Sequence, residues 1–237
     1  VVGRERLPRA VSLEEAWREG FRYALQFRKD ALELVRLDMP RLGSLRVDFA
    51  CAAMKYRLER GRIQRSLMAR AIGIRAGKEL VVMDATTGLG RDAFILAALG
   101  CRVLCYERAA VMRMLLVDGL RRAGTDPNLA EICGRMVLKE GDSICALTKG
   151  QVESPDVIYL DPMFPDIRRK ALCKKEMRFC REIAGDDADA DRLLAVALES
   201  GCRRVAVKRM RHDPPLGNKP PTHSISGKSN RFDVYLR

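Results

Sequence analysis

No apolar run in this sequence of 237 residues approaches the roughly 20 residues that a membrane-crossing helix needs. Its first residues also lack an apolar segment followed by a small-residue cleavage site. These two absences argue against a helical membrane protein and a secreted one. We therefore expect a soluble protein of the cytoplasm with no membrane partner.

Paired metal ligands are missing as well. The chain has eight cysteines with no CxxC pair and only two histidines, His212 and His223. Neither a zinc site nor a disulfide framework fits this spacing and chain length. Both histidines lie in a tail rich in proline and glycine, with no GxSxG turn upstream, which argues against a hydrolase with a Ser or Cys nucleophile. We expect no metal, and we interpret the cysteines as reduced, mostly buried thiols.

Positive charge is in excess. Lys and Arg number 44 against 31 Asp and Glu, which gives a net charge of +13 at pH 7. Such an excess favours a polyanionic partner, although a solvated basic surface without any such partner is the alternative. Hydrophobic residues make up 47% of the chain, enough for a real core.

From Leu80 onward, short apolar runs alternate with segments of helical length. The runs are "LVVMD", "CRVLCYE", "RMVLKEGD", "DVIYLD" and "CRRVAVK", and "RFDVYL" closes the chain. The intervening "RDAFILAALG", "AAVMRMLLVDGLRRAG" and "DDADADRLLAVALESG" have helical apolar spacing and end in glycine. This alternation predicts an α/β fold, a Rossmann-like sheet over residues 79–237.

Residues 1–78 differ from the rest of the chain. Here "YALQF", "ALELVRLD" and "SLRVDFA" indicate short strands, and a helix is expected from Ala52 to Ile72. We predict a small N-terminal α+β domain with a boundary between Gly73 and Lys78.

A glycine turn follows the first strand of the predicted sheet. Gly88, Gly90 and Ala93 satisfy the G-x-G-x-x-A pattern, in which the backbone approaches a ligand at a helix N-terminus. Glu107, after the next strand, can accept hydrogen bonds from ribose hydroxyls of a nicotinamide cofactor or of S-adenosylmethionine. The Asp84 carboxylate would repel a diphosphate but attract an ammonium group, which favours S-adenosylmethionine. The alternative is a tight turn that binds nothing.

The stretch "DPMF" follows the fourth predicted strand. Asp161 therefore falls at the edge where open α/β sheets bind ligands. Its carboxylate and the Pro162 carbonyl could orient an exocyclic amine toward a methyl donor, and Phe164 could stack on a base. The alternative is that Asp161 and Pro162 only end a strand while Phe164 packs in the core.

Cations follow this stretch closely and recur after the fifth strand. We predict that they neutralise nucleic-acid phosphates. They are Arg168, Arg169, Lys170, Lys174, Lys175, Lys208, Arg209 and Arg211.

Together these segments resemble the small-subunit (16S) ribosomal RNA methyltransferase J family. The resemblance rests on "RLGSLRVDF", "DATTGLGRDAFILAALGCRV", "YLDPMFP", "KALCKKEMR", "DADRLL", "RVAVKR" and "RFDVY". It implies S-adenosylmethionine-dependent methylation of the N2 amine of a guanosine in 16S rRNA, with the rRNA or the small ribosomal subunit as partner. Members of that family extend further at the N-terminus, and their stretch near Arg60 to Arg65 is richer in glycine.

The resemblance also implies the cofactor contacts. Carried over by position, they fall on Arg91, Asp92, Glu107, Arg108, Asp142, Ser143 and Asp161. The family has two serines where this chain has Asp142 and Ser143, so the role of Asp142 departs from the pattern.

Three alternatives stay open on the sequence. A DNA amino-methyltransferase would share the Asp-Pro-x-aromatic stretch. A nicotinamide-dependent oxidoreductase would fit the glycines but would leave that stretch and the cations unexplained. A non-catalytic RNA-binding module would fit the charge alone.

Overall fold

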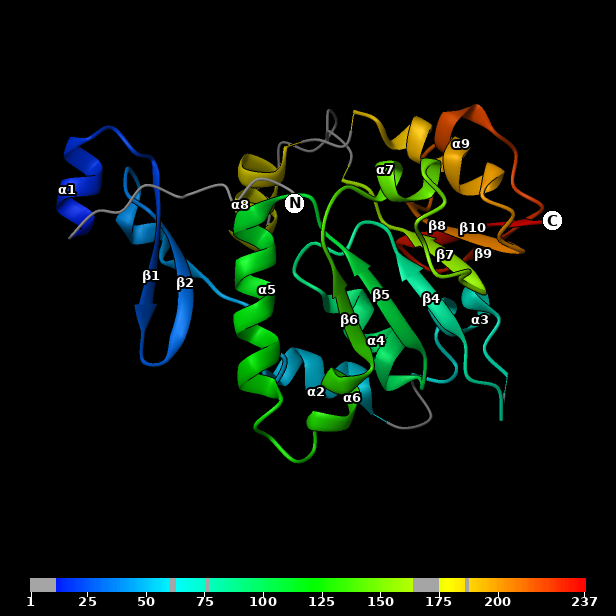
Figure 1. Ribbon diagram of the computed structural model, residues 1–237, viewed down its shortest axis with the longest axis horizontal. Coiled ribbons are helices and arrows are strands. Elements are labelled where there is room, and N and C mark those ends of the chain that lie inside the picture. Colours follow the sequence, from blue (N-terminus) through cyan, green and yellow to red (C-terminus); the bar gives the residue numbers. More distant parts are fainter. Residues whose placement is uncertain (1–11, 60–62, 76, 164–174, 186–187) are drawn as a thin grey trace.

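The computed structural model describes residues 12–59, 63–75, 77–163, 175–185 and 188–237 (Figure 1). Residues up to 78 contribute α1 (Leu13–Arg18), β1 (Tyr23–Arg28), β2 (Ala31–Arg36), the 3-10 turn η1 (Pro40–Leu42), β3 (Ser44–Leu45), α2 (Ala52–Leu58) and α3 (Leu67–Ile72). The remainder contributes β4 (Val81–Asp84), α4 (Arg91–Ala98), β5 (Arg102–Tyr106), α5 (Ala110–Ala123), α6 (Ala130–Gly134), β6 (Met136–Lys139), α7 (Ser143–Thr148), β7 (Val157–Leu160), α8 (Lys175–Ala184), α9 (Ala190–Glu199), β8 (Arg204–Met210), η2 (Leu216–Asn218), β9 (His223–Ser226) and β10 (Asn230–Leu236).

A seven-stranded sheet forms the centre of the molecule, in the order β6-β5-β4-β7-β8-β10-β9. Strands β4 to β8 run parallel, and β10 is antiparallel to both β8 and β9. All the predicted strands from Leu80 onward are present, and the prediction of a Rossmann-like sheet is confirmed. The chain builds outward from β4 to β6 and then returns to place β7 on the other side of β4. Open α/β sheets bind ligands at the carboxyl ends of the strands where the strand order reverses, which here are β4 and β7.

The two faces of the sheet carry separate apolar cores. One contains Phe94 of α4 and Leu115 of α5, and the other contains Leu147 of α7 and Leu193 of α9. All four residues of β7 are buried, as expected for a parallel strand covered on both faces. Because β7 is buried on both sides, the position of its end is well defined, and so is the position of the residues that follow it.

A smaller antiparallel sheet of β1, β2 and β3 lies against α5, on the side away from the large sheet (Figure 1). The three strands predicted in this region are confirmed, although β3 has only two residues. Gly119 lets α5 approach the chain that follows β3 closely, because a Cβ atom at Gly119 would lie 2.4 Å from Cγ1 of Val47. The domain division near residue 78 stays a prediction, and one apolar core contains residues from both sides of it.

The prediction of a single helix from Ala52 to Ile72 is wrong. The structure has two helices instead, α2 and α3. Helix α2 ends where Glu59 leaves the helical region, with φ −50° and ψ 124°. Ser66 then starts α3, since its side chain accepts a hydrogen bond from the backbone N–H of Ala69 at 3.1 Å.

Within the described ranges, no helix is long and apolar enough to cross a membrane, and no cluster of three or more His, Cys, Asp or Glu could hold a metal ion. All seven cysteines in these ranges are free. Only Cys101, Cys105 and Cys202 are fully buried, so the expectation of mostly buried thiols is wrong for this part of the chain.

Candidate active site

The glycine turn after β4 has the backbone that its sequence predicts. Gly88 and Gly90 both have positive φ angles, 55° and 74°. Gly90 starts α4, and a Cβ atom there would lie 2.5 Å from Cδ1 of Leu116, so any other residue at this position would have to displace a buried side chain. At Gly88 an added Cβ would meet nothing within 4 Å. The turn therefore borders open space on its Gly88 side.

Glu107 holds this turn to the end of β5. Its two carboxylate oxygens accept hydrogen bonds from the backbone N–H groups of Gly88 and Ala109, each at 2.7 Å. Both bonds are charge-assisted, and the side chain is almost fully buried. Glu107 therefore fixes the shape of the glycine turn, a role that the sequence did not indicate.

Asp161 lies where the sequence predicts, directly after β7, and it pairs with Lys208. The Lys208 Nζ atom lies 2.6 Å from Oδ2 of Asp161 and 2.7 Å from Oδ2 of Asp92. The backbone N–H of Asp161 donates to Oγ1 of Thr86 at 2.7 Å, which ties the end of β7 to the glycine turn. The Asp161 side chain remains 36% exposed, so a substrate can reach it. Pro162 follows and is buried.

Asp92, at the start of α4, completes this cluster. Its Oδ2 also accepts a hydrogen bond from the Tyr159 hydroxyl at 2.8 Å, and its Oδ1 pairs with the Arg57 guanidinium at 2.9 Å. Sequence reasoning did not place Tyr159 or Arg57 beside Asp92. Tyr159 lies within an apolar strand, and Arg57 comes from α2, far away in the sequence, so no local pattern marks either of them.

The charges in the cluster set its protonation. Although 36% of the Asp161 side chain is exposed, the surrounding protein removes much of the water around its carboxylate, and this desolvation raises the pKa of Asp161 to about 6. Lys208 opposes the shift and Asp92 adds to it. Burial also acts on Asp92, but the charges of Lys208 and Arg57 outweigh it and hold the pKa of Asp92 below its ordinary value. Around neutral pH the cluster thus contains two carboxylates with a shared ammonium between them.

Asp84 adds a further carboxyl group to the same edge of the sheet. It is 1% exposed and accepts a hydrogen bond from the backbone N–H of Thr86 at 3.1 Å. Burial raises the pKa of Asp84 well above its ordinary value, and the negative charges of Asp92, Asp161 and Glu107 add to that effect.

This set of groups fits S-adenosylmethionine better than a diphosphate. A sulfonium or an ammonium group would be attracted by the carboxylates at the ends of β5 and β7, whereas a diphosphate would be repelled. Asp84 does not contribute the attraction expected from the sequence, because it is buried and its raised pKa favours the neutral form. The open space beside Gly88 leaves room for a ligand at the N-terminus of α4.

The remaining predicted cofactor residues surround the same edge. Arg108 forms two contacts with the Asp189 carboxylate, at 3.0 and 2.8 Å. Asp142 caps α7 by accepting a hydrogen bond from the backbone N–H of Cys145 at 2.9 Å, and Ser143, the first residue of that helix, is buried. The side chain of Arg91 is exposed at the start of α4. Asp142 thus has a structural role that a serine could also fill.

Two of the cations predicted to bind RNA lie elsewhere than expected. Lys208 is half-buried in the carboxylate cluster rather than exposed to a phosphate. Arg209 is 7% exposed, and its guanidinium donates to the carbonyl oxygen of Pro214 at 3.2 and 2.8 Å. Because successive strand residues face opposite sides of the sheet, Lys208 and Arg209 cannot both reach the ligand side. Arg211 is exposed.

Several predicted residues fall outside the described part of the chain. Phe164, Arg168, Arg169, Lys170 and Lys174 are among them. Lys175 begins α8, but its side chain also lies outside the description.

Comparison with known proteins points to one chemistry. Residues 7–237 match the family model described as "Putative SAM-dependent methyltransferase". The chain is 47% identical over 218 residues to ribosomal RNA small subunit methyltransferase J of Aeromonas salmonicida, an alignment that covers 90% of this chain and 86% of the relative. It is 43% identical to the protein of the same name from Shewanella amazonensis, with 97% and 94% covered.

A solved structure agrees with these matches. The crystal structure of a SAM-dependent methyltransferase from Neisseria gonorrhoeae superimposes with a TM-score of 0.71 at 32% identity, and the match covers 90% of this chain and 82% of that one. The match extends beyond the sheet, because it includes most of the N-terminal region as well. The chain therefore belongs to the ribosomal RNA small subunit methyltransferase J family of S-adenosylmethionine-dependent methyltransferases.

Proposed function

We propose that this protein methylates the N2 amine of a guanosine in 16S rRNA of the small ribosomal subunit, in the cytoplasm. The names of its relatives, ribosomal RNA small subunit methyltransferase J, support the substrate class. The observation that carries the proposal within the molecule is the Asp161 carboxylate, which is accessible after β7 and held by Lys208 at 2.6 Å.

The proposed cofactor site lies along the carboxyl ends of β4 to β7. It comprises Asp84, Gly88, Gly90, Arg91, Asp92, Glu107, Arg108, Asp142, Ser143 and Asp161. When bound, S-adenosylmethionine supplies an electrophilic methyl group on a positively charged sulfur. Glu107 holds the glycine turn by accepting a hydrogen bond from the backbone N–H of Gly88, and Gly88 presents no side chain to the ligand.

Asp161 and Pro162 orient the amine. The lone pair of an exocyclic guanine amine is delocalised into the ring, which makes the amine a poor nucleophile. Hydrogen bonds from its two N–H groups to the Asp161 carboxylate and the Pro162 carbonyl would direct the lone pair toward the methyl group. Lys208 engages Oδ2 of Asp161, so the amine would bond to Oδ1.

The ionised form of Asp161 is the form that accepts this hydrogen bond. Lys208 favours that form, because its ammonium lies against the carboxylate. As the new N–C bond forms, the nitrogen becomes positively charged and must lose a proton. Either Asp161 or water receives that proton, and Asp161 is the group already bonded to the amine.

The target base must leave its stack to reach this edge of the sheet. We propose that Phe164 stacks on its face. Arg168, Arg169, Lys170, Lys174, Lys175 and Arg211 would neutralise phosphates of the surrounding RNA.

A substrate panel tests the proposal. Small ribosomal subunits, free rRNA and DNA are each incubated with the protein and S-adenosylmethionine labelled in its methyl group. Label in the subunits or the rRNA supports the proposal. Label in DNA alone would assign the protein to the amino-methyltransferases of DNA. Measurable cofactor binding with no label in any of the three would contradict the assigned substrate.

A further inference from the structure

Arg57 lies at the edge of the proposed cofactor site, although it comes from the N-terminal region of the chain. It belongs to the last turn of α2. Its Nη2 donates to Oδ1 of Asp92 at 2.9 Å, and Asp92 is the second residue of α4, directly after the glycine turn. The Arg57 side chain is 43% exposed. An accessible cation therefore lies beside the N-terminus of α4.

The contact with Asp92 leaves most of this guanidinium unused. A guanidinium carries five N–H donors, and within the described ranges the bond to Asp92 is the one hydrogen bond that Arg57 makes. Asp92 does not depend on Arg57 alone, because its Oδ2 also accepts hydrogen bonds from Lys208 at 2.7 Å and from Tyr159 at 2.8 Å. Arg57 therefore has donors and charge available for a further anionic partner.

S-adenosylmethionine carries such an anionic group. Its sulfonium and ammonium groups are attracted by the carboxylates of Glu107 and Asp161, but the same carboxylates repel its α-carboxylate. The site therefore needs a cation that offsets this repulsion. The N-terminus of α4 supplies partial positive charge, and Arg57 adds a full charge beside it. A planar guanidinium also matches a carboxylate in shape, because two of its N–H groups can donate in parallel.

Two other cations at this edge of the sheet are engaged by carboxylates of the protein. Lys208 bridges two of them, at 2.6 and 2.7 Å. Arg108 makes two contacts with Asp189, at 3.0 and 2.8 Å. Arg91, which is exposed in the first turn of α4, is a rival for the cofactor carboxylate. Arg57 is favoured because Asp92 already holds its guanidinium at the helix terminus, so little further ordering is needed to bind a ligand.

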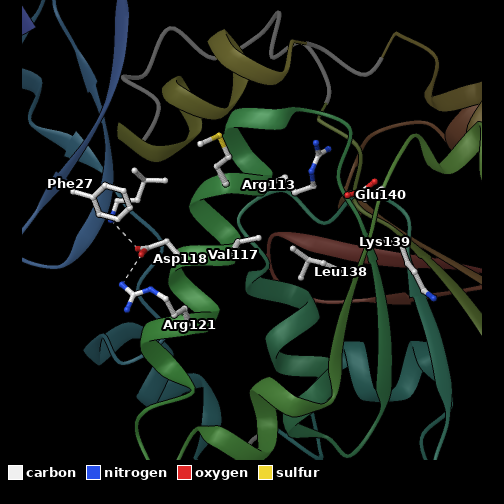
Figure 2. Close-up of a pocket in the computed structure, with 10 residues that line it drawn as sticks. Phe27, Arg113, Val117, Asp118, Arg121, Leu138, Lys139 and Glu140 are labelled. Carbon is white, nitrogen blue, oxygen red and sulfur yellow. Dashed lines mark hydrogen bonds and ion pairs between the residues drawn. The ribbon is translucent and has the colours of Figure 1, made fainter. Parts of the chain in front are cut away.

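Arg113 is the rival at the other end of the site. It lies on α5, where it lines a groove between that helix and the β1-β2 hairpin (Figure 2). It donates to the carbonyl oxygen of Glu107 at 3.3 Å, so it lies at the end of β5, the part of the site predicted to bind the ribose. In S-adenosylmethionine the sulfur atom separates the ribose from the amino-acid end. Arg113 is therefore a poorer match for the carboxylate than Arg57.

We propose that Arg57 binds the α-carboxylate of S-adenosylmethionine while it stays paired with Asp92. One nitrogen of the guanidinium is fixed by Asp92, and its other N–H groups donate to the cofactor. The inference rests on the proposed function, because it adds a residue to the cofactor site proposed above. It gives α2, which precedes the large sheet in the chain, a part in recognising the cofactor.

Two ligands that differ in the carboxylate alone test this assignment. S-adenosylmethionine and its decarboxylated form share the sulfonium and the ammonium groups. Their Kd values are measured by isothermal titration calorimetry in the absence of RNA. We expect the wild type to bind S-adenosylmethionine at least about tenfold more tightly than the decarboxylated form, the effect of one hydrogen-bonded charge pair.

Arg57→Met should remove most of this difference. The Kd of S-adenosylmethionine should rise about tenfold, while the Kd of the decarboxylated form stays within about twofold of the wild-type value. Arg102→Met is the matched control. Arg102 is also 43% exposed and pairs with Glu153 at 2.6 Å, but it begins β5 and so lies at the opposite edge of the sheet. This control should leave both Kd values unchanged.

An equal loss of affinity for the two ligands in Arg57→Met would overturn the proposal, because it would show that Arg57 acts through Asp92 alone. So would a difference that survives in Arg57→Met but disappears in Arg91→Met or Arg113→Met. Arg57→Lys keeps the charge without the planar fork and should retain part of the difference, which provides a second test if Arg57→Met does not fold.

Methylation of rRNA by the wild type is assayed separately. If Arg57→Met loses the preference for the carboxylate but the wild type methylates no rRNA, the proposed substrate is contradicted and the assignment of Arg57 stands. If the wild type methylates rRNA but Arg57→Met keeps the full preference, the assignment of Arg57 fails and the proposed function stands.

Discussion

The ammonium of Lys208 lies 2.6 Å from the carboxylate of Asp161, although 47 residues separate them in the chain. The parallel register of β7 and β8 explains the pairing. Leu160 lies opposite Val207, so the next residue of each strand, Asp161 and Lys208, meets at the carboxyl edge. The pair is therefore a direct result of strand alignment, and it places a cation against the group that we propose orients the substrate amine.

Replacing Lys208 by Met should lower kcat about tenfold at pH 7, because Asp161 loses the charge that favours its ionised form. Lys208→Arg keeps a cation and should retain most of the activity. The measurement is kcat across pH 5.5 to 9. The deficit of Lys208→Met should shrink as the pH rises and Asp161 ionises. A deficit that is constant with pH would indicate a purely structural role.

The wild-type rate should rise with pH through a value near 6. The pKa of Asp161 is raised to about 6, and only the ionised carboxylate accepts the hydrogen bond from the amine. Asp161→Ala should abolish this dependence and lower kcat at least a hundredfold, a loss on the order of that for a misplaced reacting group. Circular dichroism checks that the fold is retained. Near-normal turnover by Asp161→Ala would contradict the assigned role.

Gly90→Ala should destabilise the fold by about 2 to 5 kcal/mol, the sum expected for a left-handed backbone and an overpacked core. The added Cβ would lie 2.5 Å from Leu116, which is fully buried. Gly88→Ala is the matched control, because its φ is also positive but its Cβ would enter open space. It should cost only about 1 kcal/mol in urea unfolding. Equal losses in the two variants would show that packing against Leu116 is unimportant.

Asp118→Ala should loosen the β1-β2 hairpin from α5. The carboxylate receives hydrogen bonds from Leu32, Arg121 and Arg122 while 5% exposed, and breaking a buried pair costs roughly 3 kcal/mol. Hydrogen exchange should accelerate at the β2 amides before those of β4. Glu131→Gln, which removes a surface partner of Arg135, is the control and should have little effect. Unchanged exchange in β2 would mean that other contacts hold the hairpin.

Most of the fold could be predicted from the sequence, because buried parallel strands leave continuous apolar runs and their helices end in glycine. The position of Asp161 followed from counting strands. Predicting that Lys208 pairs with Asp161 requires the register of β7 against β8. The sequence indicates that register only if the two apolar runs are aligned. The contact of Arg57 with Asp92 depends on the packing of α2 against α4, and no local pattern in the sequence encodes that packing. The helix break before Ser66 was missed, although Ser is a common N-cap residue.

The most direct test of the central claim is identification of the methylated nucleoside. Small ribosomal subunits that lack the modification are incubated with the protein and labelled S-adenosylmethionine, and the rRNA is digested and separated by chromatography with mass detection. The account predicts label in N2-methylguanosine of 16S rRNA, and none when Asp161→Ala replaces the wild type. Label in a different nucleoside, or in N2-methylguanosine at equal rates with both proteins, would contradict it.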